Sequence, residues 1–187
     1  MTFHYRNSYE DFIQFNLYNS DHSDSMQAYI RIVQFGMAIV FLVFYYLSSM
    51  IITTIPAVAW LIFYLVVTVL WIVFYPTLRR KSTVRRLKKI IAAGHLKGFE
   101  GERSISFQEE GLVATGGEKG EARLKYSGVT RIGTQEGSVY IFVGNKNAFI
   151  LPAGAFTAEE ERQALLDLLK SRTKAEFISE KASFLGI

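Results

Sequence analysis

The sequence contains no cysteine and only three prolines and three histidines. The lack of cysteine excludes disulfides, thiolate metal sites and cysteine nucleophiles. Residues 32–78 lack charge altogether: these 47 residues include no Asp, Glu, Lys, Arg or His. A bilayer core takes roughly 20 helical residues, so this stretch is too long for one span and fits two. Two buried helices of a soluble bundle would each need a polar face, and polar residues do not recur here at helical spacing.

The point where the two spans divide is marked by polar residues and a proline. Residues 48–49 and 53–54 are Ser or Thr, and Pro56 suits the first turn of a helix. We therefore expect transmembrane helices over residues 30–49 and 56–75, within a hydrophobic segment spanning residues 30–76. The connecting turn is short, so the helices should form an antiparallel hairpin with both ends on one side.

Basic residues next to the spans predict the orientation of this hairpin. The side chains that follow the second span are Arg79, Arg80, Lys81, Arg85, Arg86, Lys88 and Lys89, whereas the hairpin turn carries no charge. By the positive-inside rule both termini should face the cytoplasm. We expect a multi-pass protein of the cell membrane with an uncleaved anchor, because no basic leader or small-residue cleavage site precedes the first apolar run.

Net charge is unevenly distributed along the chain. Residues 1–31 carry a net charge of −2, residues 79–98 carry +8, and residues 99–187 carry −2. The basicity of the protein therefore belongs to the segment next to the membrane. This distribution argues against a nucleic-acid partner, because a nucleic-acid-binding domain would carry the positive stripe on its own surface.

The basic segment, residues 77–98, has helical periodicity. Val84, Leu87, Ile90 and Ile91 recur at helical spacing between the basic residues, and Gly94 is placed to end the helix. Such an amphipathic helix can lie at the interface and attract anionic lipids through the seven basic residues named above. The simpler interpretation is that these charges only fix the topology, and both interpretations stay open.

Residues 99–175 have a different pattern, in which short alternating segments are separated by glycine-rich turns. Six strands are predicted, over residues 104–108, 112–115, 122–126, 129–134, 139–143 and 148–151. Thr157 and Glu160 form a capping box for a helix that carries Leu165, Leu166, Leu168 and Leu169. The predicted fold class is therefore a membrane α-helical hairpin plus an α+β cytoplasmic domain. That domain is expected to be a PH-like antiparallel sheet or partly open barrel capped by a C-terminal helix, followed by a tail over residues 176–187.

The first 29 residues are predicted to contain a strand and an amphipathic helix on the cytoplasmic side. Residues 2–6 alternate, and Ser8 with Asp11 resembles the N-cap of a helix reaching about Tyr18. We expect residues 3–6 to pair with an edge of the tail sheet and the helix to lie near the membrane.

Leu151, Pro152 and Phe156 stand at a corner between the last strand and the last helix. Pro152 ends the strand, and Phe156 precedes the helix cap, which is typical of packing. The functional alternative is a peptide-docking corner, because an extended segment can bind between a helix and an adjacent strand.

No enzymatic constellation is found. His4, His22 and His95 lie in three different segments, which does not favour a Ser-His-Asp arrangement. Asp21, His22 and Asp24 lack a further spaced ligand for a metal ion and are better explained as a polar linker. We predict no catalytic residue, no metal and no cofactor, and therefore no enzyme.

Several motifs together resemble a known family. They are the segment at residues 9–18, the hairpin, the basic stretch, the Glu109-Glu110-Gly111 turn, and residues 149–157 before an acidic helix. This order is similar to the YcxB-like bacterial membrane proteins. The resemblance implies a plasma-membrane protein with a PH-like tail and implies no established activity or catalytic residue.

Two functional classes remain open. The first is a membrane-tethered interaction or regulatory module that binds an unidentified protein partner, for instance by strand addition. The second is a protein that responds to anionic membrane lipids through the basic helix. The sequence does not predict the oligomeric state.

Overall fold

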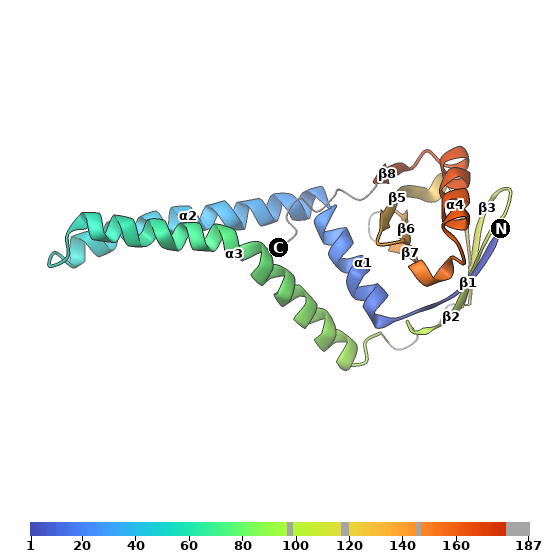
Figure 1. The fold of residues 1–187 in the computed structure, drawn as a ribbon, viewed down its shortest axis with the longest axis horizontal. Coiled ribbons are helices and arrows are strands. Elements are labelled where there is room, and N and C mark those ends of the chain that lie inside the picture. The colour runs from blue at the N-terminus through green and yellow to red at the C-terminus, as the bar shows by residue number, and fades with distance from the viewer. Residues whose placement is uncertain (97–98, 117–119, 145–146, 179–187) are drawn as a thin grey trace. The chain divides into compact units, whose positions relative to one another are not determined.

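The computed structural model describes residues 1–96, 99–116, 120–144 and 147–178 (Figure 1). It divides into two compact units, described separately: the folded unit, Met1–Asn16 with Ile90–Ile187, and the helical unit, Leu17–Lys89. Parts of two predicted turns, residues 117–119 and 145–146, lie outside the described residues, as do residues 97–98 and 179–187.

The helical unit is built from two long apolar helices, α2 (Asp24–Ile51) and α3 (Ala57–Ala92). Each is long and apolar enough to cross a membrane, and almost none of its most apolar stretch is buried within the protein, 6% in α2 and 0% in α3. The predicted division into two helices is present. The second span and the basic segment, predicted as separate elements, form one helix, because α3 continues through Pro76 into the basic residues.

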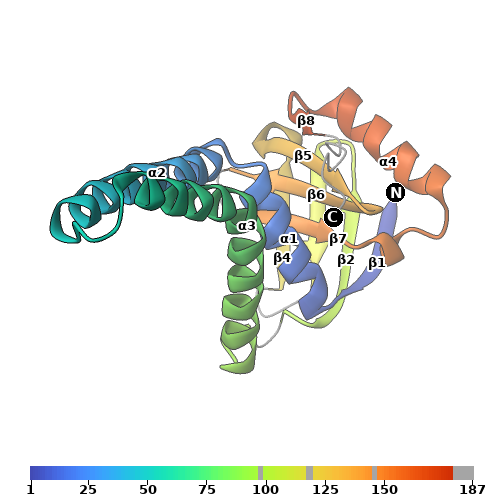
Figure 2. The same cartoon turned by 60° about the vertical axis from the view of Figure 1, so that its left-hand side comes forward.

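The continuity of α3 depends on how the backbone around Pro76 is satisfied. Proline has no N–H, so the carbonyl of Ile72, four residues earlier, loses its usual helical partner. The side-chain amide of Gln34 in α2 donates to that carbonyl oxygen at 2.9 Å. Figures 1 and 2 show α3 changing direction partway along its length, and Pro76 is its only internal proline. A polar residue of the neighbouring helix thus stabilises a bent but unbroken α3.

Two further contacts join α2 and α3. The hydroxyls of Ser48 and Tyr64 lie 3.0 Å apart, and the rings of Phe41 and Trp71 meet edge to face with centroids 6.4 Å apart. These contacts hold the two helices side by side as an antiparallel pair, which we call the apolar hairpin.

The folded unit contains two four-stranded sheets. The first sheet has the order β1-β2-β3-β4 and the second β7-β6-β5-β8. The strands are β1 (Thr2–Asn7), β2 (Gly101–Phe107), β3 (Gly111–Thr115), β4 (Glu121–Lys125), β5 (Val129–Gln135), β6 (Ser138–Val143), β7 (Asn147–Leu151) and β8 (Glu176–Ile178). Short 3-10 turns lie at Tyr126–Gly128 and Ala153–Ala155. All six strands predicted after residue 99 are therefore present, with ends shifted by a few residues at most.

The N-terminal strand completes the first sheet. β1 pairs antiparallel with β2, from Thr2 opposite Ser106 to Asn7 opposite Gly101. The predicted pairing of residues 3–6 with a sheet edge is thus confirmed. Because β1 alternates, Phe3 and Tyr5 are buried on its inner side, while Thr2, His4 and Arg6 are exposed.

The second sheet holds a strand that the sequence analysis missed. β8 pairs parallel with β5, with Arg131 opposite Glu176 and Gly133 opposite Ile178. Phe177 packs against the core. The predicted boundary between domain and tail at residue 176 is therefore wrong, since β8 belongs to the sheet. The strand was not predicted, because three residues are too few to show a readable alternation.

The hydrophobic core lies between the two sheets and α4 (Glu159–Arg172). Its completely buried side chains come from both sheets and from the helix, namely Ile105, Leu112, Val139, Ile141, Leu151, Leu165 and Leu169. The predicted apolar face of α4 therefore faces the core. Thr157 lies just before Ala158, the N-cap residue of this helix, and its backbone N–H and hydroxyl donate to Glu161 at 2.9 and 3.0 Å, so the predicted capping box of Thr157 with Glu160 is wrong. The helix begins later than the capping-box spacing requires.

The outer side of the second sheet is covered by α1 (Tyr9–Asp21). The Phe15 ring packs on Tyr140 and Phe142 of β6, with centroids 5.5 and 5.6 Å away. Ser8 and Asp11 cap α1 reciprocally, because the Ser8 N–H donates to the Asp11 carboxylate at 2.8 Å and the Asp11 N–H donates to the Ser8 hydroxyl at 3.2 Å. The N-terminal segment thus supplies both a strand and a covering helix to the folded unit.

Candidate functional site

The basic half of α3 exposes six of the seven cations predicted to face lipid. Those six are Arg80, Lys81, Arg85, Arg86, Lys88 and Lys89. Within the described part of the chain none of them makes an ion pair. Their charges are therefore available to an external anionic partner.

Arg79 is the exception, because its guanidinium is already engaged within the protein. Its guanidinium donates a hydrogen bond to the Ser20 hydroxyl and lies 3.9 Å from the Asp21 carboxylate. Its side chain is only 22% exposed. Ser20 and Asp21 end α1, and the last turn of that helix has no basic residue of its own, so a cation at this negative helix end is favourable. Arg79 therefore ties α3 to the end of α1.

A hollow of about 380 Å³ follows one face of α3 where the apolar half meets the basic half. We call it the α3 hollow. Its described lining residues are Trp71, Tyr75, Leu78, Arg79, Ser82, Thr83 and Arg86. The Trp71 and Tyr75 rings lie 5.1 Å apart in a tilted arrangement at its apolar end. The α3 hollow thus joins an aromatic wall to two guanidinium groups and two hydroxyls.

The apolar face of the basic half is partly covered by the protein. Leu87 is buried, and Val84, Ile90 and Ile91 are half-buried. The central leucine of this face is therefore not accessible to lipid. Gly94 has φ of 75° and donates its N–H to the Ile91 carbonyl at 2.9 Å, as expected for the residue that ends the helix.

The predicted docking corner is filled by the chain itself. Leu151 and Pro152 are buried, and the half-buried Phe156 ring meets the Phe3 ring edge to face at 5.3 Å. Phe3 comes from β1, so the N-terminal strand packs against this corner. Pro152 also borders a separate hollow of about 290 Å³, but the charged side chains of that hollow are the carboxylates Glu10, Asp11 and Glu136. Its chemistry does not suit an apolar peptide.

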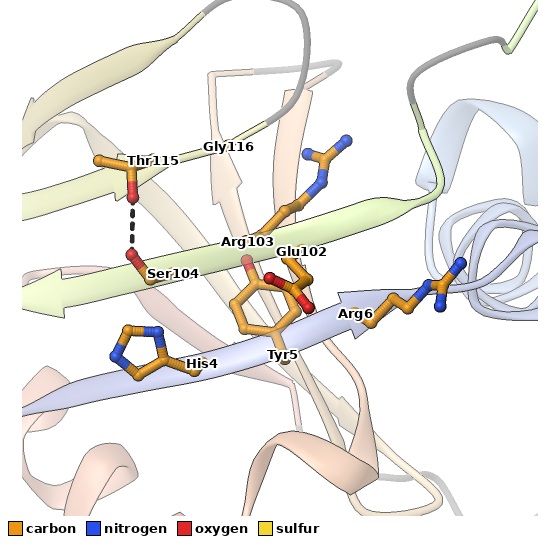
Figure 3. A pocket seen from close by; sticks show the side chains of 8 residues that line it. All are labelled: His4, Tyr5, Arg6, Glu102, Arg103, Ser104, Thr115 and Gly116. Atoms are coloured by element: carbon orange, nitrogen blue, oxygen red, sulfur yellow. Dashed lines mark hydrogen bonds between the residues drawn. The ribbon is translucent and has the colours of Figure 1, made fainter.

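The outer side of the first sheet is open and polar. A shallow hollow of about 510 Å³ lies over β1, β2 and β3 (Figure 3). Its side chains include His4 and Arg6 from β1, Glu102 from β2, and a hydroxyl pair, Ser104 and Thr115, whose oxygens lie 2.6 Å apart. We call this side, with Lys125 on β4, the open sheet face. The sequence does not predict this hollow, because polar alternation indicates an exposed side but no concavity.

Gly116 borders this hollow at the end of β3, with φ of 107°. A Cβ atom at this position would lie 2.5 Å from the Glu102 carbonyl oxygen. Only glycine therefore allows the two backbones to approach this closely.

Tyr5 and Arg103 lie opposite each other on β1 and β2 at the edge of the same hollow. Burial disfavours the phenolate and raises the pKa of Tyr5 to about 12, although the nearby Arg103 cation acts in the opposite direction. Tyr5 is thus a neutral structural residue at physiological pH.

The residues that the sequence analysis considered for catalysis or metal binding are engaged elsewhere. His22 stacks on Tyr18, and its Nδ1 lies 2.9 Å from the Tyr18 carbonyl oxygen. Asp21 contacts Arg79, as described above. Among the described residues no group of three or more His, Asp or Glu side chains could hold a metal ion.

The architecture defines a class of protein in which a sheet-and-helix domain is joined to two long apolar helices. Within this chain, residues 107–169 match the family model described as YcxB-like protein. The match runs from the end of β2 into α4 and confirms the predicted resemblance for that segment. No curated protein and no solved structure matches the chain.

Proposed function

We propose that this protein is a non-enzymatic bacterial membrane protein, in which the apolar hairpin anchors a PH-like cytoplasmic domain that binds a protein partner. The observation that carries the proposal is the exposure of the apolar hairpin. Side chains such as Ile39, Ile62 and Val73 are 66%, 59% and 61% exposed. In water such a surface would be costly, at about 25 cal/mol per Å² of apolar area, whereas in a bilayer it is solvated by lipid.

The pairing of β1 with β2 supports a hairpin with both ends on one side. β1 precedes α2 in the chain, and β2 follows α3, yet they share a sheet from Thr2 to Asn7. Two strands can pair in this way only if both lie in the same compartment. The six exposed cations of α3 then favour the cytoplasm for that compartment.

The open sheet face is the proposed partner surface. The second sheet is covered on its outer side by α1, and β1 fills the docking corner, whereas the first sheet keeps an uncovered polar side with His4, Arg6 and Lys125. The two sheets and the C-terminal helix α4 also support the PH-like assignment of this domain.

The absence of cysteine makes the topology directly testable. Single cysteines introduced as Thr53→Cys, at the hairpin turn, and Lys125→Cys, on β4, can be labelled in intact cells with a membrane-impermeant maleimide. We expect labelling of the first variant only, and labelling of both after lysis. Labelling of the Lys125→Cys variant in intact cells would overturn the proposed orientation.

The partner surface is tested by proximity labelling from the full-length chain. The double variant Arg6→Glu and Lys125→Glu reverses charge on the open sheet face, and Lys174→Glu, outside that face, is the matched control. We expect the first to lose labelled proteins that the control retains. Equal protein sets from both variants would place the contact elsewhere.

A second candidate function is a response to anionic lipids. The six exposed cations of α3, which make no ion pair within the described residues, favour it, since each basic residue near an anionic surface contributes about 1 kcal/mol. Full-length protein in nanodiscs with phosphatidylglycerol should unfold at higher temperature than in pure phosphatidylcholine, and added salt should remove the difference. Identical unfolding temperatures would refute this function.

A further inference from the structure

We propose that the α3 hollow binds the phosphate of an anionic glycerophospholipid, with Arg86, Ser82 and Thr83 as the contacting residues. The proposal rests on the membrane anchoring argued above and names the ligand of the lipid-responsive function. It differs from general attraction of a basic helix, because it assigns one lipid to one place.

The lining residues form a single stripe along α3. Counting the adjacent pairs 78–79 and 82–83 as single steps, the lining residues recur every three or four positions, which places them on one face of the helix. The stripe begins with Trp71, Tyr75 and Leu78 and ends with Ser82, Thr83 and Arg86. Aromatic and apolar groups therefore precede hydroxyl and cationic groups, in the order in which acyl chain, glycerol and phosphate follow one another in a leaflet.

The two guanidinium groups have different roles. Arg79 and Arg86 are seven residues apart, or about 10 Å along the helix, with the hydroxyls between them. Arg79 is already bound to Ser20 and Asp21 at the end of α1, so it is a positioning residue. Arg86 is exposed and makes no ion pair within the described residues, so it is the group available to hold a phosphate through two parallel N–H bonds.

The hydroxyls of Ser82 and Thr83 are also available. Thr68, earlier in the same helix, donates its hydroxyl to the Tyr64 carbonyl at 2.7 Å. In the described structure neither Ser82 nor Thr83 makes such a bond. Both hydroxyls can therefore donate to a phosphate oxygen next to Arg86.

The lining and size of the hollow favour a lipid over a soluble phosphate. No carboxylate lines the described part of the hollow, which favours an anion, and its volume of about 380 Å³ exceeds what inorganic phosphate needs. Trp71, Tyr75 and Leu78 would be left facing water if the ligand had no apolar part. A phospholipid satisfies both ends of the hollow at once.

The test uses purified full-length protein carrying Trp60→Phe, so that Trp71 is the remaining tryptophan, and its emission is excited selectively. Dihexanoyl phosphatidylglycerol is titrated, with dihexanoyl phosphatidylcholine and inorganic phosphate as comparison ligands. We expect saturable quenching or shift of Trp71 emission with phosphatidylglycerol. Arg86→Gln should weaken the affinity by about tenfold or more, because a hydrogen bond to a charged group contributes about 1.5–3 kcal/mol.

The matched control is Arg85→Gln, which removes the same charge from an exposed residue outside the hollow. It should leave the affinity within about twofold of the unsubstituted protein, while Arg86→Lys should be intermediate, since it keeps charge without the fork. Equal losses for Arg85→Gln and Arg86→Gln would overturn the site and leave the general lipid response standing. Equal binding of inorganic phosphate would overturn the choice of a lipid. Unfolding temperatures of all variants identify any that lose the fold. If an arginine variant does so, the double variant Ser82→Ala and Thr83→Val is tested in its place, and we expect it to weaken binding.

Discussion

The hydrogen bond from Gln34 to the Ile72 carbonyl should stabilise the apolar hairpin only because Pro76 is present. Gln34→Leu keeps the side-chain size and removes the donor, leaving a carbonyl with no partner in an apolar environment. Interhelical hydrogen bonds in membranes contribute about 0.6 kcal/mol on average and up to about 1.7. The Ile72 carbonyl has no alternative helical donor, so we expect a loss of about 1–2 kcal/mol.

The matched background is Pro76→Ala, which restores a backbone N–H four residues after Ile72. In that background Gln34 is no longer needed, and Gln34→Leu should cost less than about 0.5 kcal/mol. The four proteins form a double-mutant cycle whose coupling energy isolates the interaction.

The assay is reversible unfolding of the full-length protein in mixed micelles, with denaturing detergent as the variable. In proteins that also carry Trp60→Phe, tryptophan fluorescence comes from Trp71 and reports on the hairpin, because its ring contacts Phe41 across the two helices. Circular dichroism at the same detergent ratios provides a second probe of the transition. If Gln34→Leu destabilises both backgrounds equally, the link between this glutamine and the proline is refuted.

Three further predictions concern the folded unit. Phe3→Ala should destabilise it by about 3–5 kcal/mol in thermal unfolding, because it removes a buried ring that contacts Phe156; an unchanged midpoint would show that β1 does not contribute to the core. Tyr5 has its pKa raised from 10 to about 12, so the neutral phenol contributes stability below pH 10 that is lost as the pH rises toward 12. Tyr5→Phe should therefore unfold at a higher alkaline pH than the unsubstituted protein, and equal midpoints would contradict this. Hydrogen bonds from the backbone and side chain of Thr157 lower the pKa of Glu161, so its contribution is present above its ordinary pKa and lost as the pH falls through the lowered one. Glu161→Gln should remove part of the acid sensitivity of α4, measured by circular dichroism between neutral and acidic pH.

Local sequence patterns were sufficient for the elements whose signals are long or repeated. The charge-free stretch predicted α2 and the apolar half of α3, and alternation between turns predicted six strands. β1 was also predictable, because residues 2–6 alternate and lie on the same side of the hairpin as the tail. β8 was not, because three residues show no period and its parallel partner β5 is more than 40 positions away.

The candidate sites were less predictable, because they depend on which residues meet across the fold. Arg79 has the same chemical character as Arg80, and only the contact with Ser20 and Asp21 distinguishes them. Leu151, Pro152 and Phe156 fit a docking corner by their sequence pattern, but Phe3, from the other end of the chain, packs against Phe156 there. The bond from Gln34 to Ile72 could have been suspected from one signal, a glutamine and an intrahelical proline within the same uncharged stretch.

The pairing of β1 with β2 also affects the order of events during biosynthesis. β1 is synthesised first, but its partner strand follows only after both apolar helices, so the sheet cannot close until the hairpin has been completed. If only one helix crossed the bilayer, β1 and β2 would be separated by it, and β2 would present an unpaired edge beside an uncovered Phe156. On the proposed topology, closure of the first sheet therefore requires that both apolar helices have inserted, because β1 and β2 otherwise lie in different compartments.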